Sequence, residues 1–73
     1  MTQQMIYQAI VCILRATQIM SEQLGPAREA VFRARIEALE TASRCALKAR
    51  DSTKLRALCD EVSQLGDEVK SLV

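Results

Sequence analysis

Apolar side chains recur along the last part of the chain at a spacing of three and four residues. They are Leu55, Leu58, Val62, Leu65, Val69 and Leu72. Because an α-helix has about 3.6 residues per turn, this spacing places all of them on one narrow side of a helix. Two apolar positions in every heptad suit contact with one close helix. The segment therefore predicts a helix over about residues 52–72 that packs against another helix.

The upstream segment also favours helices, since the chain has only two glycines, one proline and two aromatic residues. A first helix is predicted over about residues 3–24. Its apolar side consists of Ile6, Ile10, Ile13, Thr17, Met20 and Leu24. Gly25-Pro26 ends this helix, because glycine accepts the left-handed conformation after a helix and proline suits the first turn of the next. A second helix is predicted over about residues 26–50.

The boundary between the second and third helices is set by the phase of the apolar pattern, since residues 48–54 contain no glycine or proline. The apolar row that begins at Phe32 falls two residues out of step with Leu55, which corresponds to about 200° of helix rotation. We therefore predict a turn near Asp51-Ser52, with either residue as the N-cap. One long bent helix is the alternative. Gly66 either lies inside the third helix or ends it early.

These elements predict an all-α fold with a single domain over residues 1–73, a small three-helix bundle. A chain of this length buries only about 60% of its unfolded surface, so further stabilisation is expected. Three cysteines and no histidine suit neither a disulfide framework nor a zinc site, which leaves assembly into a dimer or larger bundle. Cys12 and Cys45 are expected in the core, and Cys59 beside it. Free cysteines favour a cytoplasmic location, and we expect no cofactor.

Apolar residues cover almost the whole circumference of the first half of the first predicted helix. Besides the row already named, Met5, Ala9, Cys12, Ala16 and Ile19 lie on one flank, and Tyr7, Val11 and Leu14 lie on the other. Two neighbouring helices cannot cover so wide a surface, and an exposed apolar patch usually marks an interface. We therefore predict contact with a partner protein through Ile6, Tyr7, Ile10, Val11, Ile13 and Leu14. The partner is a second copy or, alternatively, a different helical protein.

The second predicted helix carries a row of small residues beside its larger apolar row. The members are Val31, Ala34, Ala38, Ala42, Cys45 and Ala49. Small side chains allow another helix backbone to come close. We therefore expect this row to receive a neighbouring helix.

Catalysis lacks the residues that it needs, because the chain has no histidine and no glycine-rich phosphate loop. The acidic pairs Asp60-Glu61 and Asp67-Glu68 fall on the polar side of the third predicted helix. Such a position is typical of solvated charges, whereas acid–base pairs lie in desolvated clefts. We therefore expect no enzyme activity. The leading interpretation is a small protein–protein interaction module that acts as an adaptor, regulator or chaperone-like factor.

A dimeric nucleic-acid-binding regulator is the alternative, because basic residues gather in the second predicted helix. The contacts would come from Arg28, Arg35, Arg44, Lys48 and Arg50. A net charge of +1 and two isolated aromatic residues weaken this interpretation, since phosphate attraction and base stacking are both limited. Membrane binding is not expected. Residues 1–14 contain no Lys or Arg for anionic headgroups, and the longest apolar run, residues 9–14, is too short for a span.

The stretch EALETA, residues 37–42, follows the glycine-containing turn and resembles the helical-hairpin co-chaperones of type III secretion needle subunits. The chain length is similar to that of small plasmid-encoded helical RNA-binding dimers. The first resemblance covers six residues and implies a secretion-system co-chaperone as a further alternative. It assigns a role to no individual residue.

Overall fold

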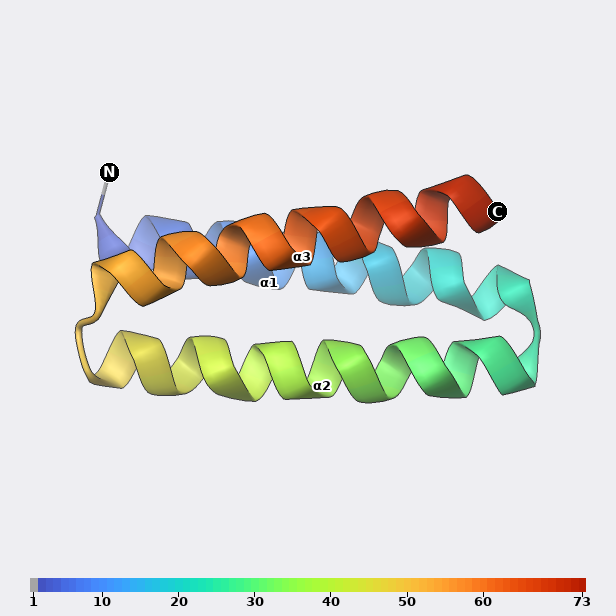
Figure 1. Ribbon diagram of the computed structural model, residues 1–73, viewed down its shortest axis with the longest axis horizontal. Helices are drawn as coiled ribbons and strands as arrows, with labels where there is room; N and C mark the ends of the chain where they lie inside the picture. Colours follow the sequence, from blue (N-terminus) through green and yellow to red (C-terminus); the bar gives the residue numbers. More distant parts are fainter. Residues whose placement is uncertain (1) are drawn as a thin grey trace.

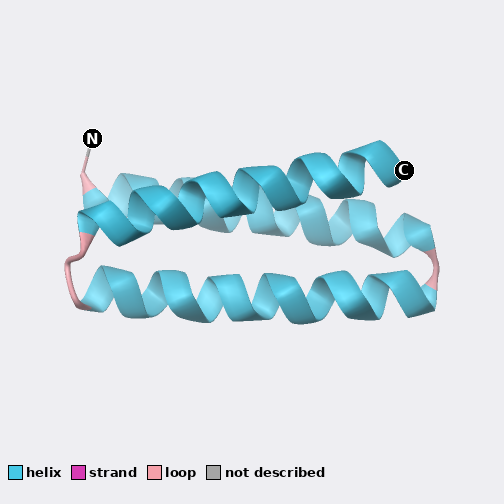
Figure 2. Cartoon of the chain, viewed as in Figure 1, coloured by secondary structure: helices cyan, strands magenta, loops and turns pink. Residues whose placement is uncertain are grey.

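The computed structural model describes residues 2–73, which form an all-α three-helix bundle without strands. The elements are α1 (Gln3–Ser21), a single 3-10 turn η1 (Glu22–Leu24), α2 (Pro26–Lys48) and α3 (Ser52–Leu72). Figures 1 and 2 show that each helix reverses the direction of the one before it, so α1 and α3 run parallel and α2 runs against both. The α2–α3 turn therefore lies at the same end of the bundle as the start of α1.

The beginning and end of α1 follow from local chemistry. Thr2 caps the helix, because its side-chain oxygen accepts a hydrogen bond from the backbone N–H of Met5 at 3.2 Å. The predicted break at Gly25-Pro26 is confirmed: Gly25 has a φ of 95°, and Pro26 is the first residue of α2. The first helix was predicted to reach residue 24, and its last three residues form the 3-10 turn η1.

The turn between α2 and α3 confirms the break that the phase of the apolar pattern predicts, and one continuous helix is wrong. Arg50 adopts the left-handed conformation with a φ of 56°. The Asp51 N–H then donates to the Ala46 carbonyl at 3.0 Å, and the Arg50 N–H donates to the Leu47 carbonyl at 3.1 Å. These two bonds form the Schellman arrangement that terminates many helices. Asp51 is the N-cap of α3 and accepts from the Lys54 N–H at 3.0 Å.

The start of α1 is fastened to this turn, since the Gln3 side-chain amide donates to the Arg50 carbonyl at 2.8 Å. At the other end of the bundle, α3 continues through Gly66 to Leu72. Gly66 therefore lies inside the helix and does not end it. A Cβ atom at Gly66 would stand 3.3 Å from the Thr17 hydroxyl oxygen, which indicates how closely α3 approaches α1 here.

The core consists of apolar side chains from all three helices. Its buried members are Ile6, Ile10, Leu14, Phe32, Ile36, Ala46, Leu55, Leu58, Val62, Leu65 and Val69. The predicted apolar side of the third helix is thus confirmed except for Leu72, which is 45% exposed. In α1 the buried side is rotated from the predicted one: Leu14 and Ser21 are buried, whereas Ile13 and Met20 are half-buried, as is Leu24 in η1. The rotation arises because α1 packs against both α2 and α3.

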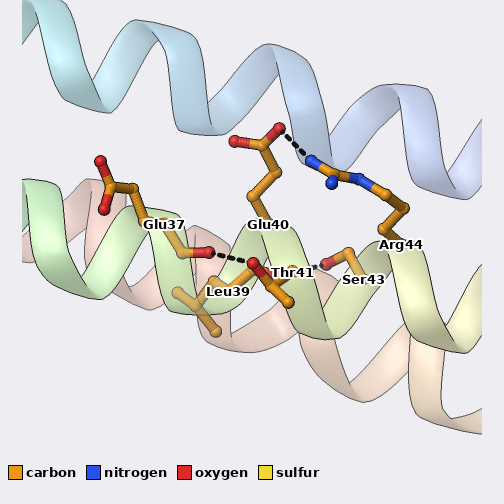
Figure 3. A network of polar contacts seen from close by, with 6 residues as sticks. All are labelled: Glu37, Leu39, Glu40, Thr41, Ser43 and Arg44. Carbon is orange, nitrogen blue, oxygen red and sulfur yellow. Dashed lines mark hydrogen bonds and ion pairs between the residues drawn. The ribbon is translucent and has the colours of Figure 1, made fainter.

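Three hydroxyl side chains lie in the core, and each is satisfied within its own helix. Thr17 donates to the Ile13 carbonyl at 2.7 Å, Ser21 to the Gln18 carbonyl at 2.8 Å and Ser43 to the Leu39 carbonyl at 2.7 Å. Figure 3 shows the Ser43 bond on α2. Because these side chains are small and need no partner on another helix, they fill the core where the helices come close.

Two expectations about small residues are wrong. Cys12 and Cys45 are exposed and do not lie in the core, whereas Cys59 packs against the core as predicted. Five of the six members of the row on α2 are exposed, Val31 at 60%, and only Ala42 packs against the core. α1 and α3 pack instead against the side of α2 with Phe32 and Ile36, because larger side chains bury more apolar area.

Candidate interaction surface on the outer side of helix 1

The six residues predicted to contact a partner fall into two groups. Ile6, Ile10 and Leu14 are at most 4% exposed, because α2 and α3 cover them. For these three the structure corrects the expectation, since they close the chain's own core, although Ile6 also lines a shallow groove between α1 and α3. Tyr7, Val11 and Ile13 are half-buried at the edges of α1. Contact of these three with a partner stays a prediction.

A different row of α1 is apolar and faces away from the bundle, and we call it the α1 outer face. It consists of Met5, Ala9, Cys12, Ala16 and Ile19, all of them exposed. The spacing of four and three residues keeps these side chains in line on the exposed flank of α1 that borders α3, where Ala9 and Ala16 also line grooves between the two helices. Met5 is 55% exposed and Ile19 is 63% exposed, so large apolar side chains stand at both ends of the row.

The apolar surface continues from the α1 outer face into two shallow grooves between α1 and α3. One groove is lined by Ile6, Ala9, Arg56, Cys59 and Asp60. The other is lined by Ile13, Ala16, Thr17, Met20, Ser63, Gly66, Asp67 and Lys70. Gly66 and the buried Thr17 line this second groove at a point where α3 comes close to α1. The two grooves lie beside the two halves of the α1 outer face.

Charge is sparse on this side of the molecule. Arg15 is the only ionisable side chain that α1 contributes besides Tyr7 and Cys12, and it is exposed away from the core. The α3 residues along the two grooves bring Arg56 and Lys70 with Asp60 and Asp67, which is two charges of each sign. The surface around the α1 outer face therefore has little net charge to oppose or select a partner.

The five basic residues predicted as nucleic-acid contacts do not form one patch. Arg28 lies near the start of α2, at the opposite end of the bundle from Lys48 and Arg50. Arg35 is engaged within the chain: it pairs with Glu68 of α3 at 3.0 Å, and its guanidinium lies 5.6 Å from the centre of the Phe32 ring. These contacts join α2 to α3 and compete with any phosphate for Arg35.

Arg44 is also held by neighbours, as Figure 3 shows for its ion pair with Glu40 at 2.9 Å. The Tyr7 hydroxyl of α1 and the Glu40 carboxylate raise the pKa of the Arg44 guanidinium above its ordinary value. Arginine is charged at all physiological pH values in any case, so the raised pKa reports proximity and creates no switch. Tyr7 and Arg44 therefore mark the edge where α1 meets α2.

The α2–α3 turn nevertheless gathers positive charge at one end of the bundle. Residues 44–56 contain five basic side chains and one acidic side chain, Asp51. Lys54 and Arg56 belong to this group although they are not among the five predicted contacts. The turn brings them to the same end of the bundle as Lys48 and Arg50. The phase slip in the apolar pattern, which predicts a turn near Asp51, is the sequence signal for this cluster of charge.

A metal centre and a membrane-spanning helix are not found within residues 2–73. No group of three or more His, Cys, Asp or Glu side chains is placed to hold a metal ion in this part of the chain. None of the described helices combines the length and the apolar character needed to cross a membrane. The chain matches no protein-family model, and no curated protein or solved structure is significantly similar to it.

Proposed function

We propose that this protein is a small helical interaction module, of the adaptor or regulator type, that binds a protein through the α1 outer face. The single observation that carries the proposal is the row of exposed apolar side chains from Met5 to Ile19, in a helix whose one charged side chain is Arg15. Contiguous apolar surface of this kind is characteristic of interfaces. Covering it is favourable by roughly 25 cal/mol for each Å² of apolar area.

A protein partner fits this face better than a lipid surface does. Helices that lie on membranes combine an apolar side with Lys and Arg that meet anionic headgroups, and α1 offers only Arg15. The small side chains of Ala9, Cys12 and Ala16 allow the backbone of a partner helix to come close. A partner helix with an apolar side of its own would therefore cover this surface and fit closely against its small central residues.

Photo-crosslinking from a matched pair of exposed positions tests the proposal. A benzophenone amino acid replaces Ile19 on α1 in one protein and Val31 on α2 in the other, because both side chains are about equally exposed. Irradiation in cells that make the protein, followed by mass spectrometry, identifies any adduct. We expect a protein adduct from position 19 that Ala16→Glu removes, and none from position 31. Equal labelling from both positions, or none from either, contradicts the proposal.

A nucleic-acid-binding regulator is the second candidate, and the positive end at residues 44–56 is the observation that favours it. Phosphate contacts make the binding constant fall steeply as salt rises, whereas an apolar interface responds little. Retention on DNA or RNA at low salt that Lys48→Glu and Lys54→Glu abolish would support this candidate. Absence of binding to either polymer at low salt removes it. The co-chaperone alternative rests on residues 37–42 alone, none of which belongs to the α1 outer face.

A further inference from the structure

We propose that a second copy of this chain covers the α1 outer face, with the two α1 helices antiparallel and a twofold axis passing beside Cys12. The inference rests on the proposed function, because it names the partner of the same surface. It is carried by three observations: the symmetry of the row of side chains, the position of the grooves and the distribution of charge along the bundle.

The row on α1 has the symmetry that a twofold contact requires. In such a contact the same patch is used by both copies, so each position n residues before the axis meets a position about n residues after it. With the axis at Cys12, Met5 meets Ile19 of the other copy and Ala9 meets Ala16. The row reads large, small, small, small, large in either direction, so it is complementary to itself.

Small residues at the centre of the row set the distance between the helices. Ala9, Cys12 and Ala16 are exposed, and their short side chains allow the axes of the two α1 helices to approach to about 8 Å. At that distance the larger side chains at the ends need space on the opposite copy. An outer face made only of large residues would instead hold the helices apart.

The two grooves between α1 and α3 lie where this space is needed. Met5 reaches the opposite copy near residue 19, beside the groove that Ala16, Met20 and Gly66 line. Ile19 reaches it near residue 5, beside the groove that Ile6, Ala9 and Cys59 line. Each large side chain thus meets a partly apolar hollow of the partner copy.

Charge selects the antiparallel arrangement over the parallel one. The end of the bundle at residues 44–56 has five basic side chains against one acidic side chain. At the opposite end, residues 22–29 and 67–70 contain four acidic side chains and two basic ones, and two of these acids, Glu29 and Glu68, are paired with Arg33 and Arg35. This end is therefore close to neutral. Antiparallel copies keep the two positive ends apart, whereas parallel copies place them side by side. Since most of these charges are exposed, they favour an orientation and contribute little to affinity.

The first test is the molar mass in solution of three proteins: the unmodified chain, Ala16→Glu and Ala38→Glu. Both alanines are exposed and lie within helices, so the same substitution on α2 is a matched control. We expect the unmodified chain and Ala38→Glu to have twice the chain mass of 8.1 kDa, and Ala16→Glu to have the mass of one chain with its helical circular dichroism retained. A dimer that Ala16→Glu leaves intact overturns the inference.

The second test fixes the orientation with disulfide reporters in a chain whose three cysteines are replaced by serine. Met5→Cys and Ile19→Cys proteins are mixed and exposed to copper phenanthroline, which takes two electrons as two thiols release two protons and form one S–S bond. We expect a covalent dimer from the mixture and almost none from either protein alone. Cross-linking of Met5→Cys with itself at a comparable yield indicates parallel helices and overturns the inference.

The outcomes for the inference and for the proposed function are separable. A folded monomer that forms a photo-adduct with a different protein from position 19 overturns the second copy and keeps the interaction module. A folded monomer without any adduct overturns both. A photo-adduct with twice the chain mass, made of this chain alone, supports both.

Discussion

The outer sides of α1 and α2 are both exposed and both rich in small residues, yet they differ in two respects. The outer side of α1 has large apolar residues, Met5 and Ile19, at its two ends and only Arg15 for charge. The outer side of α2 consists largely of alanine, with Thr41, Cys45 and one large apolar residue, Val31. Charged residues flank it on both sides, and several are paired, as in Arg33–Glu29 and Arg44–Glu40.

The two rows of small residues look alike in the sequence, but their exposure has different physical explanations. Exposed alanine has the highest helix propensity and exposes little apolar area, so an alanine row bordered by ion pairs is sufficient to explain a solvated helix. Exposed methionine and isoleucine present more apolar area to solvent than alanine does, and neither has a higher helix propensity than alanine. The α1 outer face is therefore the surface that we propose a partner covers, and the outer side of α2 is not.

The largest expected effect comes from the buried side of the same helix. Leu14→Asp places a charge in the core without a partner, and the loss of burial together with the cost of the charge should reduce the free energy of unfolding by at least about 4 kcal/mol. We expect loss of most helical circular dichroism. Ala16→Glu, two residues away on the outer side, serves as the control and should stay helical. If Leu14→Asp remained folded, the assignment of the two sides of α1 would be wrong.

Replacing the large ends of the α1 outer face tests its role directly. Met5→Ser together with Ile19→Ser removes two large side chains from each copy, or four from a dimer. At about 1 kcal/mol for each partly buried side chain, the dissociation constant should rise roughly a thousandfold. Sedimentation equilibrium measures the change. Val31→Ser on α2 removes a side chain of comparable exposure and should leave the dissociation constant unchanged; an equal change would erase the distinction between the two helices.

The alanine row of α2 should matter for helix stability alone. Ala38→Gly costs about 1 kcal/mol of helix propensity at an exposed interior position. We therefore expect a lower midpoint in urea denaturation with no change in the dissociation constant. A shift in the dissociation constant at unchanged urea midpoint would show that the α2 row is itself an interface.

The smallest expected effect concerns Gly66, which lies beside the α1 outer face. Gly66→Ala should gain about 1 kcal/mol of helix propensity. However, the new Cβ would stand 3.3 Å from the Thr17 hydroxyl, which a 2.7 Å bond to the Ile13 carbonyl holds in place. We expect a net change in the free energy of unfolding below about 0.5 kcal/mol, with the full gain appearing only when Thr17→Ala is also present. If Gly66→Ala raised the free energy of unfolding equally with and without Thr17→Ala, the contact between the new Cβ and the Thr17 hydroxyl would have no cost.

The sequence predicts the helices and their breaks well, because local chemistry determines them. Gly25-Pro26 ends one helix wherever it occurs, and a phase slip of two residues cannot be accommodated in a straight helix. The five inner residues of α3, from Leu55 to Val69, are predicted for the same reason. A single apolar row flanked by charges leaves one possible buried side.

The candidate site is harder to predict, because α1 itself carries apolar side chains on several of its sides. Ile6, Ile10 and Leu14 were expected at an interface, but the positions of α2 and α3 place them in the core. Periodicity alone does not tell which arc of such a helix its own chain covers, since that depends on the packing of two other helices. The exposure of Cys12 follows from the same cause. The row of five outward residues is visible in the sequence, but its exposure is not.

The central claim is that the α1 outer face is a contact between two copies, and the molar mass of the unmodified chain tests it most directly. Sedimentation equilibrium should be measured over a wide range of protein concentration under reducing conditions, so that no disulfide contributes. We predict a reversible equilibrium that approaches twice the chain mass of 8.1 kDa as concentration rises. A fully helical protein that keeps the mass of one chain at every concentration would contradict the claim.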